Sequence, residues 1–152
     1  MKITEYLIAQ HRVFLELLSS IEELKTSHKL ENALGLKELI FAIVTVVEKH
    51  ADIEEKFLFP ELKPYLGEQM SPIAVMELEH AEIRKIISTL KESMDPHVVR
   101  VEAAKFIIFL RDHIAKEEMV LFPLTEDMID EKRLEAIAKT VINLEKAKTE
   151  AT

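Results

Sequence analysis

Residues 50–60 read His-Ala-Asp-Ile-Glu-Glu-Lys-Phe-Leu-Phe-Pro, and residues 113–123 read His-Ile-Ala-Lys-Glu-Glu-Met-Val-Leu-Phe-Pro. Both segments match the pattern H-x-x-x-E-E-x-x-L-F-P, in which six of the eleven positions are identical. The residues on the apolar face of each segment follow one another at alternating steps of four and three, the spacing of one side of an α-helix. These faces contain Leu36, Ile40, Ile43, Val47, His50, Glu54 and Phe57, and Val99, Ala103, Phe106, Leu110, His113, Glu117 and Val120.

The stretches that precede these two helices also resemble each other. The apolar face of the earlier stretch aligns with that of the later one: Leu7, His11, Phe14, Leu18 and Ile21 with Met76, His80, Ile83, Ile87 and Leu90. Each face contains one histidine among apolar residues. The chain is therefore interpreted as a two-helix unit that occurs twice.

Prolines and capping residues set the expected helix limits. The first helix is predicted over about 4–26 and the second over about 30–59, because Pro60 cannot continue a helix. The third and fourth helices are predicted to begin at Ser71-Pro72 and Asp95-Pro96, each an N-cap followed by proline in the first turn. The fourth is expected to end at residue 122, before Pro123.

Short connections between long helices favour an all-α fold, an up-down-up-down four-helix bundle. The bundle is expected to cover about residues 4–123 of a single domain that comprises residues 1–152. An additional C-terminal helix is predicted over about 130–148, with its apolar residues on one face. It would pack on the outside of the bundle or form the contact of a homodimer. Its expected apolar face contains Leu134, Ile137, Val141 and Leu144.

Composition and charge exclude several classes of function. The 152 residues include no cysteine, which excludes disulfides, iron–sulfur clusters and thiolate zinc sites. The net charge of −8 disfavours a nucleic-acid partner, which requires a basic surface. The most apolar stretch, residues 36–47, is too short and too interrupted to cross a membrane. The first six residues lack the apolar run of a signal peptide, so we expect the protein in the cytoplasm.

Histidines and glutamates on the inward faces predict a metal site. His50 and Glu54 are four residues apart, as are His113 and Glu117, so each pair lies on one helix face. Counting helical rise from the expected ends places these histidines, His11 and His80 at about one level of the bundle. Buried carboxylates need a partner charge or a metal. The sequence therefore predicts two metal ions; a buried His–Glu network without metal is the alternative.

The predicted ligands restrict the metal. Six nitrogen and oxygen ligands suit a pair of iron ions, or of manganese ions, better than a structural zinc ion with four ligands. A ferritin-type site needs Glu-x-x-His on two helices. Only Glu77-Leu78-Glu79-His80 fits that pattern, which disfavours a ferritin-like centre.

In these motifs the chain resembles the hemerythrin-like HHE cation-binding domains, over about residues 4–123. The resemblance implies a non-haem di-iron centre that binds O2 or a related diatomic. It implies that His11 and His50 hold one iron and that His80 and His113 hold the other. Glu54 and Glu117 would bridge the two ions together with an oxo or hydroxo group.

Two positions depart from the family pattern. The family has a second histidine one turn after the third-helix histidine, where this chain has Arg84. It also places its last carboxylate five residues after the histidine, which here is Glu118, whereas the internal repeat favours Glu117. An apolar pocket of Phe14, Val47, Ile83 and Leu110 is expected beside the metals.

Four functions are compatible with such a centre. The leading hypothesis is binding of O2 or a related diatomic at two iron ions. The alternatives are iron storage or sensing, turnover of peroxide or nitric oxide by a di-iron enzyme, and a purely structural bundle. Arg84 favours the enzymatic alternative, because it leaves one iron with fewer imidazole ligands.

Overall fold

A computed structural model describes residues 1–25, 30–67, 69 and 71–151. The described residues form α-helices and two single π-helical turns, η1 and η2, and they contain no strand. The elements are α1 (Ile3–Lys25), α2 (Leu30–Ile53), η1 (Glu54–Leu58), α3 (Phe59–Leu66), α4 (Pro72–Glu92), α5 (Pro96–Lys116), η2 (Glu117–Leu121), α6 (Phe122–Met128) and α7 (Glu131–Glu150).

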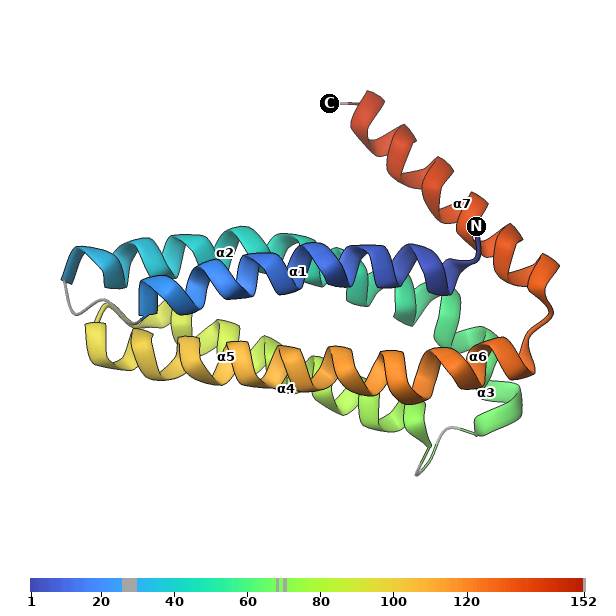
Figure 1. Ribbon diagram of the computed structural model, residues 1–152, viewed down its shortest axis with the longest axis horizontal. Helices are drawn as coiled ribbons and strands as arrows, with labels where there is room; N and C mark the ends of the chain where they lie inside the picture. The colour runs from blue at the N-terminus through green and yellow to red at the C-terminus, as the bar shows by residue number, and fades with distance from the viewer. Residues whose placement is uncertain (26–29, 68, 70, 152) are drawn as a thin grey trace.

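The four long helices α1, α2, α4 and α5 form the predicted up-down-up-down bundle (Figure 1). Helix α1 packs against α2 and α5, and α4 packs against α5. Helices α3 and α6 extend the bundle at one end, where α7 turns away from the bundle axis (Figure 1). The predicted end of the first helix, at residue 26, lies outside the described residues. No helix among the described residues is long and apolar enough to cross a membrane.

The predicted helix starts are confirmed by their caps. The Ser71 hydroxyl accepts a hydrogen bond from the backbone N–H of Ala74, at 3.2 Å. The Asp95 carboxylate accepts one from the N–H of His97, at 2.9 Å. Each N-cap satisfies a backbone donor that the first helical turn leaves without a partner.

The predicted ends of the second and fourth helices are wrong, because the chain remains helical through Pro60 and Pro123. In both places a π-helical turn comes first, so that the N–H of Phe59 bonds to the carbonyl of Glu54, five residues back. The N–H of Phe122 bonds to the carbonyl of Glu117 in the same way. Each proline lies in the first turn of a new helical segment, where its missing N–H is not needed.

The π-helical turns also shift the inward-facing register by one residue. The sequence pattern places Phe57 and Val120 inward, but the buried residues are Leu58 and Leu121. Phe57 is half-buried, and Val120 is 48% exposed. A π-helical turn contains an extra residue, which rotates everything after it around the helix axis.

Two apolar clusters fill the bundle and leave a polar layer between them. On α1, Leu7 belongs to one cluster and Phe14 to the other, and His11 lies between them. Helices α2 and α4 show the same order, with His50 and His80 at the change from one cluster to the other. The polar layer is therefore closed off from both ends by packed side chains.

Most of the predicted apolar face of α7 packs against other helices of the same chain. Leu134, Ile137 and Val141 are buried with residues of α1, η1 and η2 in the second apolar cluster. Leu144 is 45% exposed, so the predicted face is shorter than expected. The homodimer contact through this helix stays a prediction.

Candidate metal centre

The six side chains that the sequence singles out are buried and meet in one layer. They form two overlapping clusters of side chains whose candidate ligand atoms lie within 4.8 Å of one another. The first group consists of His11, His50, Glu54 and Glu117. The second group consists of His80, His113, Glu54 and Glu117. Both glutamates thus belong to both groups.

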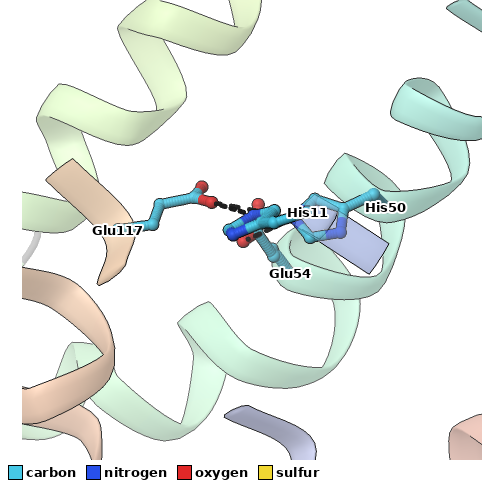
Figure 2. Close-up of side chains that lie close together, drawn as sticks. All are labelled: His11, His50, Glu54 and Glu117. Atoms are coloured by element: carbon cyan, nitrogen blue, oxygen red, sulfur yellow. Dashed lines mark hydrogen bonds and ion pairs between the residues drawn. The ribbon is translucent and has the colours of Figure 1, made fainter. Parts of the chain in front are cut away.

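In the first group, imidazole nitrogens and carboxylate oxygens converge from four elements (Figure 2). The Nε2 atoms of His11 and His50 are 3.1 Å apart. Glu117 Oε2 lies 2.9 Å from Nε2 of His11, and Glu54 Oε1 lies 3.2 Å from Nε2 of His50. Glu117 approaches the rings from the side opposite to His50 (Figure 2).

The second group uses the other oxygen of each glutamate. Glu117 Oε1 lies 2.7 Å from Nε2 of His113, and Glu54 Oε2 lies 3.3 Å from Nε2 of His80. The two ring centroids are 4.9 Å apart. Each glutamate therefore presents one oxygen to each pair of histidines, the arrangement expected of a carboxylate that bridges two ions.

The opposite nitrogen of each ring faces a side-chain oxygen outside the cluster. Nδ1 of His11 lies 2.9 Å from Glu118 Oε1, and Nδ1 of His80 lies 2.8 Å from Glu55 Oε1. These are the second glutamates of the two H-x-x-x-E-E motifs. Nδ1 of the remaining histidines faces the side chains of Gln10 and Glu79, at 2.7 and 3.5 Å: His50 with Gln10 and His113 with Glu79.

This arrangement fits a metal better than it fits a network of hydrogen bonds. A neutral imidazole has one N–H, and in His11, His50 and His80 the hydrogen bonds above use it at Nδ1. The Nε2 lone pairs of those rings then face carboxylate lone pairs. Both oxygens of Glu54 and of Glu117 are buried without a hydrogen bond, although imidazole nitrogens lie nearby. A cation between these atoms would satisfy all of them.

The family model of the Hemerythrin HHE cation binding domain matches residues 2–125. The chain belongs to the hemerythrin family. The match covers the four long helices and both H-x-x-x-E-E-x-x-L-F-P segments, and it leaves α7 outside. The metal-binding character predicted from the sequence is thus shown, and hemerythrin-like domains typically bind iron.

Curated relatives of this hemerythrin domain include the Iron-sulfur cluster repair protein YtfE of Escherichia coli O139:H28 and that of Shigella boydii serotype 18. Each is 33% identical over 101 residues, which cover 59% of this chain and 46% of the relative. The match therefore spans about half the length of those relatives. No solved structure matches the chain.

Burial and charge act in opposite directions on the ionisable groups of the hemerythrin cluster. Burial alone would lower the pKa of His50, but the adjacent carboxylates of Glu54 and Glu117 raise it to about 10. Burial would raise the pKa of Glu117, yet the adjacent imidazoles of His11, His113 and His50 hold that pKa well below its usual range. Without a metal, the buried carboxylates therefore favour the protonated forms of His50 and His113, whose pKa values they raise.

The Leu-Phe-Pro part of each motif also contributes to the hemerythrin site. The ring of Phe59 stacks on His80, with centroids 5.9 Å apart, and that of Phe122 stacks on His11, at 5.6 Å. Each phenylalanine thus covers the ring whose Nδ1 bonds to the second glutamate of the same motif. These phenylalanines were not assigned to the site from the sequence, although both motifs repeat them together with the glutamates.

A small apolar cavity of about 20 Å³ adjoins the four imidazoles, as predicted. That volume is enough for one water-sized molecule. Phe14, Val47, Ile83 and Leu110 all line it, as the sequence predicted, and Arg84 and Glu48 stand on its outer side.

The structure places the two departures from the family pattern outside the cluster. The Arg84 side chain is 44% exposed, and its guanidinium bonds to Glu55 at 3.3 Å. Glu118 bonds to His11 from outside, whereas Glu117 is fully buried between the rings. The geometry thus agrees with the position that the internal repeat favours.

Proposed function

We propose that the six side chains hold two iron ions, and that the protein binds O2 or a related diatomic at this centre. The ligands would be His11, His50, Glu54, His80, His113 and Glu117. The observation that carries the proposal is that two His2Glu2 groups share both of their glutamates. Manganese would suit the same nitrogen and oxygen donors and is the alternative metal.

The side chains around the cluster would hold these ligands in place. Glu118, Gln10 and Glu55 accept hydrogen bonds from Nδ1 of His11, His50 and His80, which directs the Nε2 lone pairs inward. Such partners fix the orientation of the ring and make it a stronger donor. When bound, a pair of ferrous ions supplies the two electrons that reversible binding of O2 requires.

The cavity would supply the place for the diatomic. Apolar side chains on α1, α2, α4 and α5 line it, so it would accommodate one small molecule beside the imidazoles. Its outer side carries Glu48 and Arg84, which mark the boundary with solvent between α2 and α4. We expect this binding to take place in the cytoplasm.

Anaerobic loading with Fe²⁺ followed by exposure to O2 tests the proposal. We expect two iron ions per chain and new charge-transfer absorption in the visible range after O2 is added. A loaded protein whose spectrum does not change with O2 or nitric oxide would refute diatomic binding. A metal content near zero would refute the metal site itself.

A second candidate function, iron storage or supply, follows from the relatives. Their name assigns them repair of iron–sulfur clusters, and the match covers 46% of their length. A domain of this kind could hold iron that is later given to a damaged cluster. Rapid transfer of iron from the loaded protein to a chelator would favour this function over binding of a diatomic. Steady turnover of H2O2 or nitric oxide would favour an enzyme.

A further inference from the structure

The cluster has two halves, which the internal repeat relates: the first half is the histidine pair of the first group with its outer partners, and the second half is the histidine pair of the second group with its outer partners. Helix α1 corresponds to α4, and α2 to α5, so that His11 corresponds to His80 and Glu118 to Glu55. The two histidine–glutamate hydrogen bonds are nearly identical, at 2.9 and 2.8 Å. Any difference in how the two halves bind a metal must therefore arise from the residues around these bonds.

The first difference lies at the glutamates. Arg84 follows His80 by four residues and donates hydrogen bonds to Glu55, so a cation shares the carboxylate that His80 uses. The corresponding residue after His11 is Leu15, which has no charge. Among the described residues, Glu118 forms an ion pair with His11 and with no lysine or arginine.

The second difference lies at the other histidine of each half. Nδ1 of His50 bonds to Gln10 at 2.7 Å. The residue that corresponds to Gln10 is Glu79, which stays 3.5 Å from Nδ1 of His113 and leaves that nitrogen without a hydrogen bond. Lys116 instead lies 3.3 Å from both oxygens of Glu79.

Lys116 is itself specific to one half. Its Nζ also lies 2.9 Å from the exposed carboxylate of Asp112. The residue that corresponds to Lys116 in the first half is Ile53, which is buried and apolar. The second half therefore has a cation beside each outer carboxylate, and the first half has none among the described residues.

These differences act on the donor strength of the imidazoles. A ring that donates Nδ1–H to an uncompensated carboxylate is a stronger metal ligand than one whose partner is neutralised. A ring with no Nδ1 partner is also less firmly oriented. Both imidazoles of the first half are held at 2.7–2.9 Å, whereas in the second half only one is held.

We propose that the two positions bind metal unequally, that the first group takes the first ion, and that Arg84 and Lys116 are positioning residues that weaken the second position. This inference rests on the proposed di-metal site. It makes the duplicated centre an ordered one, with one ion held firmly and the other exchanged more readily.

Calorimetric titration of the metal-free full chain with Co²⁺ tests the inference, because Co²⁺ accepts the same nitrogen and oxygen donors. We expect two binding steps whose dissociation constants differ by at least about tenfold. Glu118→Gln should weaken the tighter step about tenfold, because it removes the charge of the partner of His11. Arg84→Gln should tighten the weaker step and bring the two steps closer together.

Arg111→Gln is the matched control. Arg111 pairs with exposed Glu22 at 2.9 Å, so its loss changes the net charge equally without touching the cluster. Two equal steps in the unaltered protein would overturn the inference and leave the di-metal site intact. So would an Arg84→Gln variant that titrates like Arg111→Gln. Binding of fewer than two Co²⁺ ions would refute the di-metal site instead.

Discussion

The Nε2 atoms of His11 and His50 lie 3.1 Å apart, although the Nδ1 atom of each ring already faces a side-chain oxygen. If both rings are neutral with their protons on Nδ1, two lone pairs face each other in a buried site. Either an extra proton or a metal ion must lie between them. The carboxylates of Glu54 and Glu117 raise the pKa of His50 to about 10, which favours the extra proton when no metal is bound.

Single substitutions of the two neighbouring glutamates of the second motif should distinguish a metal ligand from a residue that orients a ligand. We expect Glu117→Gln to lower the metal content below two ions per chain, because the carboxylate that faces both groups loses its charge. Glu118→Gln should keep two ions and bind them more weakly, by about tenfold at one position. Elemental analysis after dialysis checks both variants. Equal metal content in the two variants would contradict the assignment of Glu117.

Removal of metal should destabilise the fold. The proposed ions would stabilise the buried carboxylates and imidazoles, and a ligand at 1,000 times its dissociation constant contributes about 4 kcal/mol. For a chain of this size we expect the melting temperature to fall by roughly 10 °C on chelation. Return of Fe²⁺ should restore it. A melting curve that chelation leaves unchanged would count against coupling of metal binding to folding.

Filling the cavity should hinder a diatomic without removing the metal. Val47→Leu adds a methylene to the wall of the 20 Å³ cavity, and we expect the rate of reaction of the ferrous protein with O2 to fall at least tenfold. Val44→Leu is the control, because Val44 is buried in the same apolar cluster and does not line the cavity. Equal rates in the two variants would mean that O2 enters elsewhere.

Deletion of Met119 tests the role of the second π-helical turn. Met119 lies in η2 and is 78% exposed, so Met119→Ala should change the free energy of unfolding by less than about 0.5 kcal/mol. Its deletion removes the extra residue, so that an ordinary α-helical turn brings Leu121 to the inward position and keeps α6 and α7 in register. We therefore expect the deletion to change the free energy of unfolding, measured by chemical denaturation, by less than about 1 kcal/mol. A loss of about 3 kcal/mol or more would show that the wide turn itself is needed for stability.

The contact between Thr4 and Glu126 should make stability weakly dependent on pH. The Thr4 hydroxyl donates a hydrogen bond to Glu126 at 2.7 Å, which with Lys2 lowers the pKa of the carboxyl despite its partial burial. The stabilisation is present above the pKa of the unfolded state and is lost as the pH falls through the lower pKa of the folded state. Glu126→Gln should remove this loss of stability at acid pH, which amounts to at most about 0.5 kcal/mol of the free energy of unfolding because the group is largely exposed. Asp127→Asn serves as the neighbouring control.

Most of the fold was accessible from the sequence because the inward faces are long and regular. Ser71-Pro72 and Asp95-Pro96 contain the caps that begin two helices, and the structure confirms both. The π-helical turns were not accessible, because no residue type specifies them. They become visible only when packing buries Leu58 and Leu121 where the α-helical pattern places Phe57 and Val120.

The sequence also predicted the six clustered side chains but not which residues orient them. Glu55 and Glu118 lie about 100° from the inward face, where a helical projection allows either a contact with a ligand or exposure to solvent. Their contacts with His80 and His11 come from a neighbouring helix of the other repeat, and a single-helix pattern contains no such information. The repeated glutamate pair was the available signal, since a surface position need not be kept in both copies.

The internal duplication has a consequence for how such a centre can be assembled. One hairpin, α1 to α3, carries His11, His50 and Glu54, and the other, α4 to α6, carries His80, His113 and Glu117. Neither hairpin alone supplies a complete group, because each of the two groups includes one glutamate from the other hairpin. A separate hairpin of this kind would have to associate with a second copy of itself to complete either group, so the duplication gives a single chain what would otherwise require a dimer.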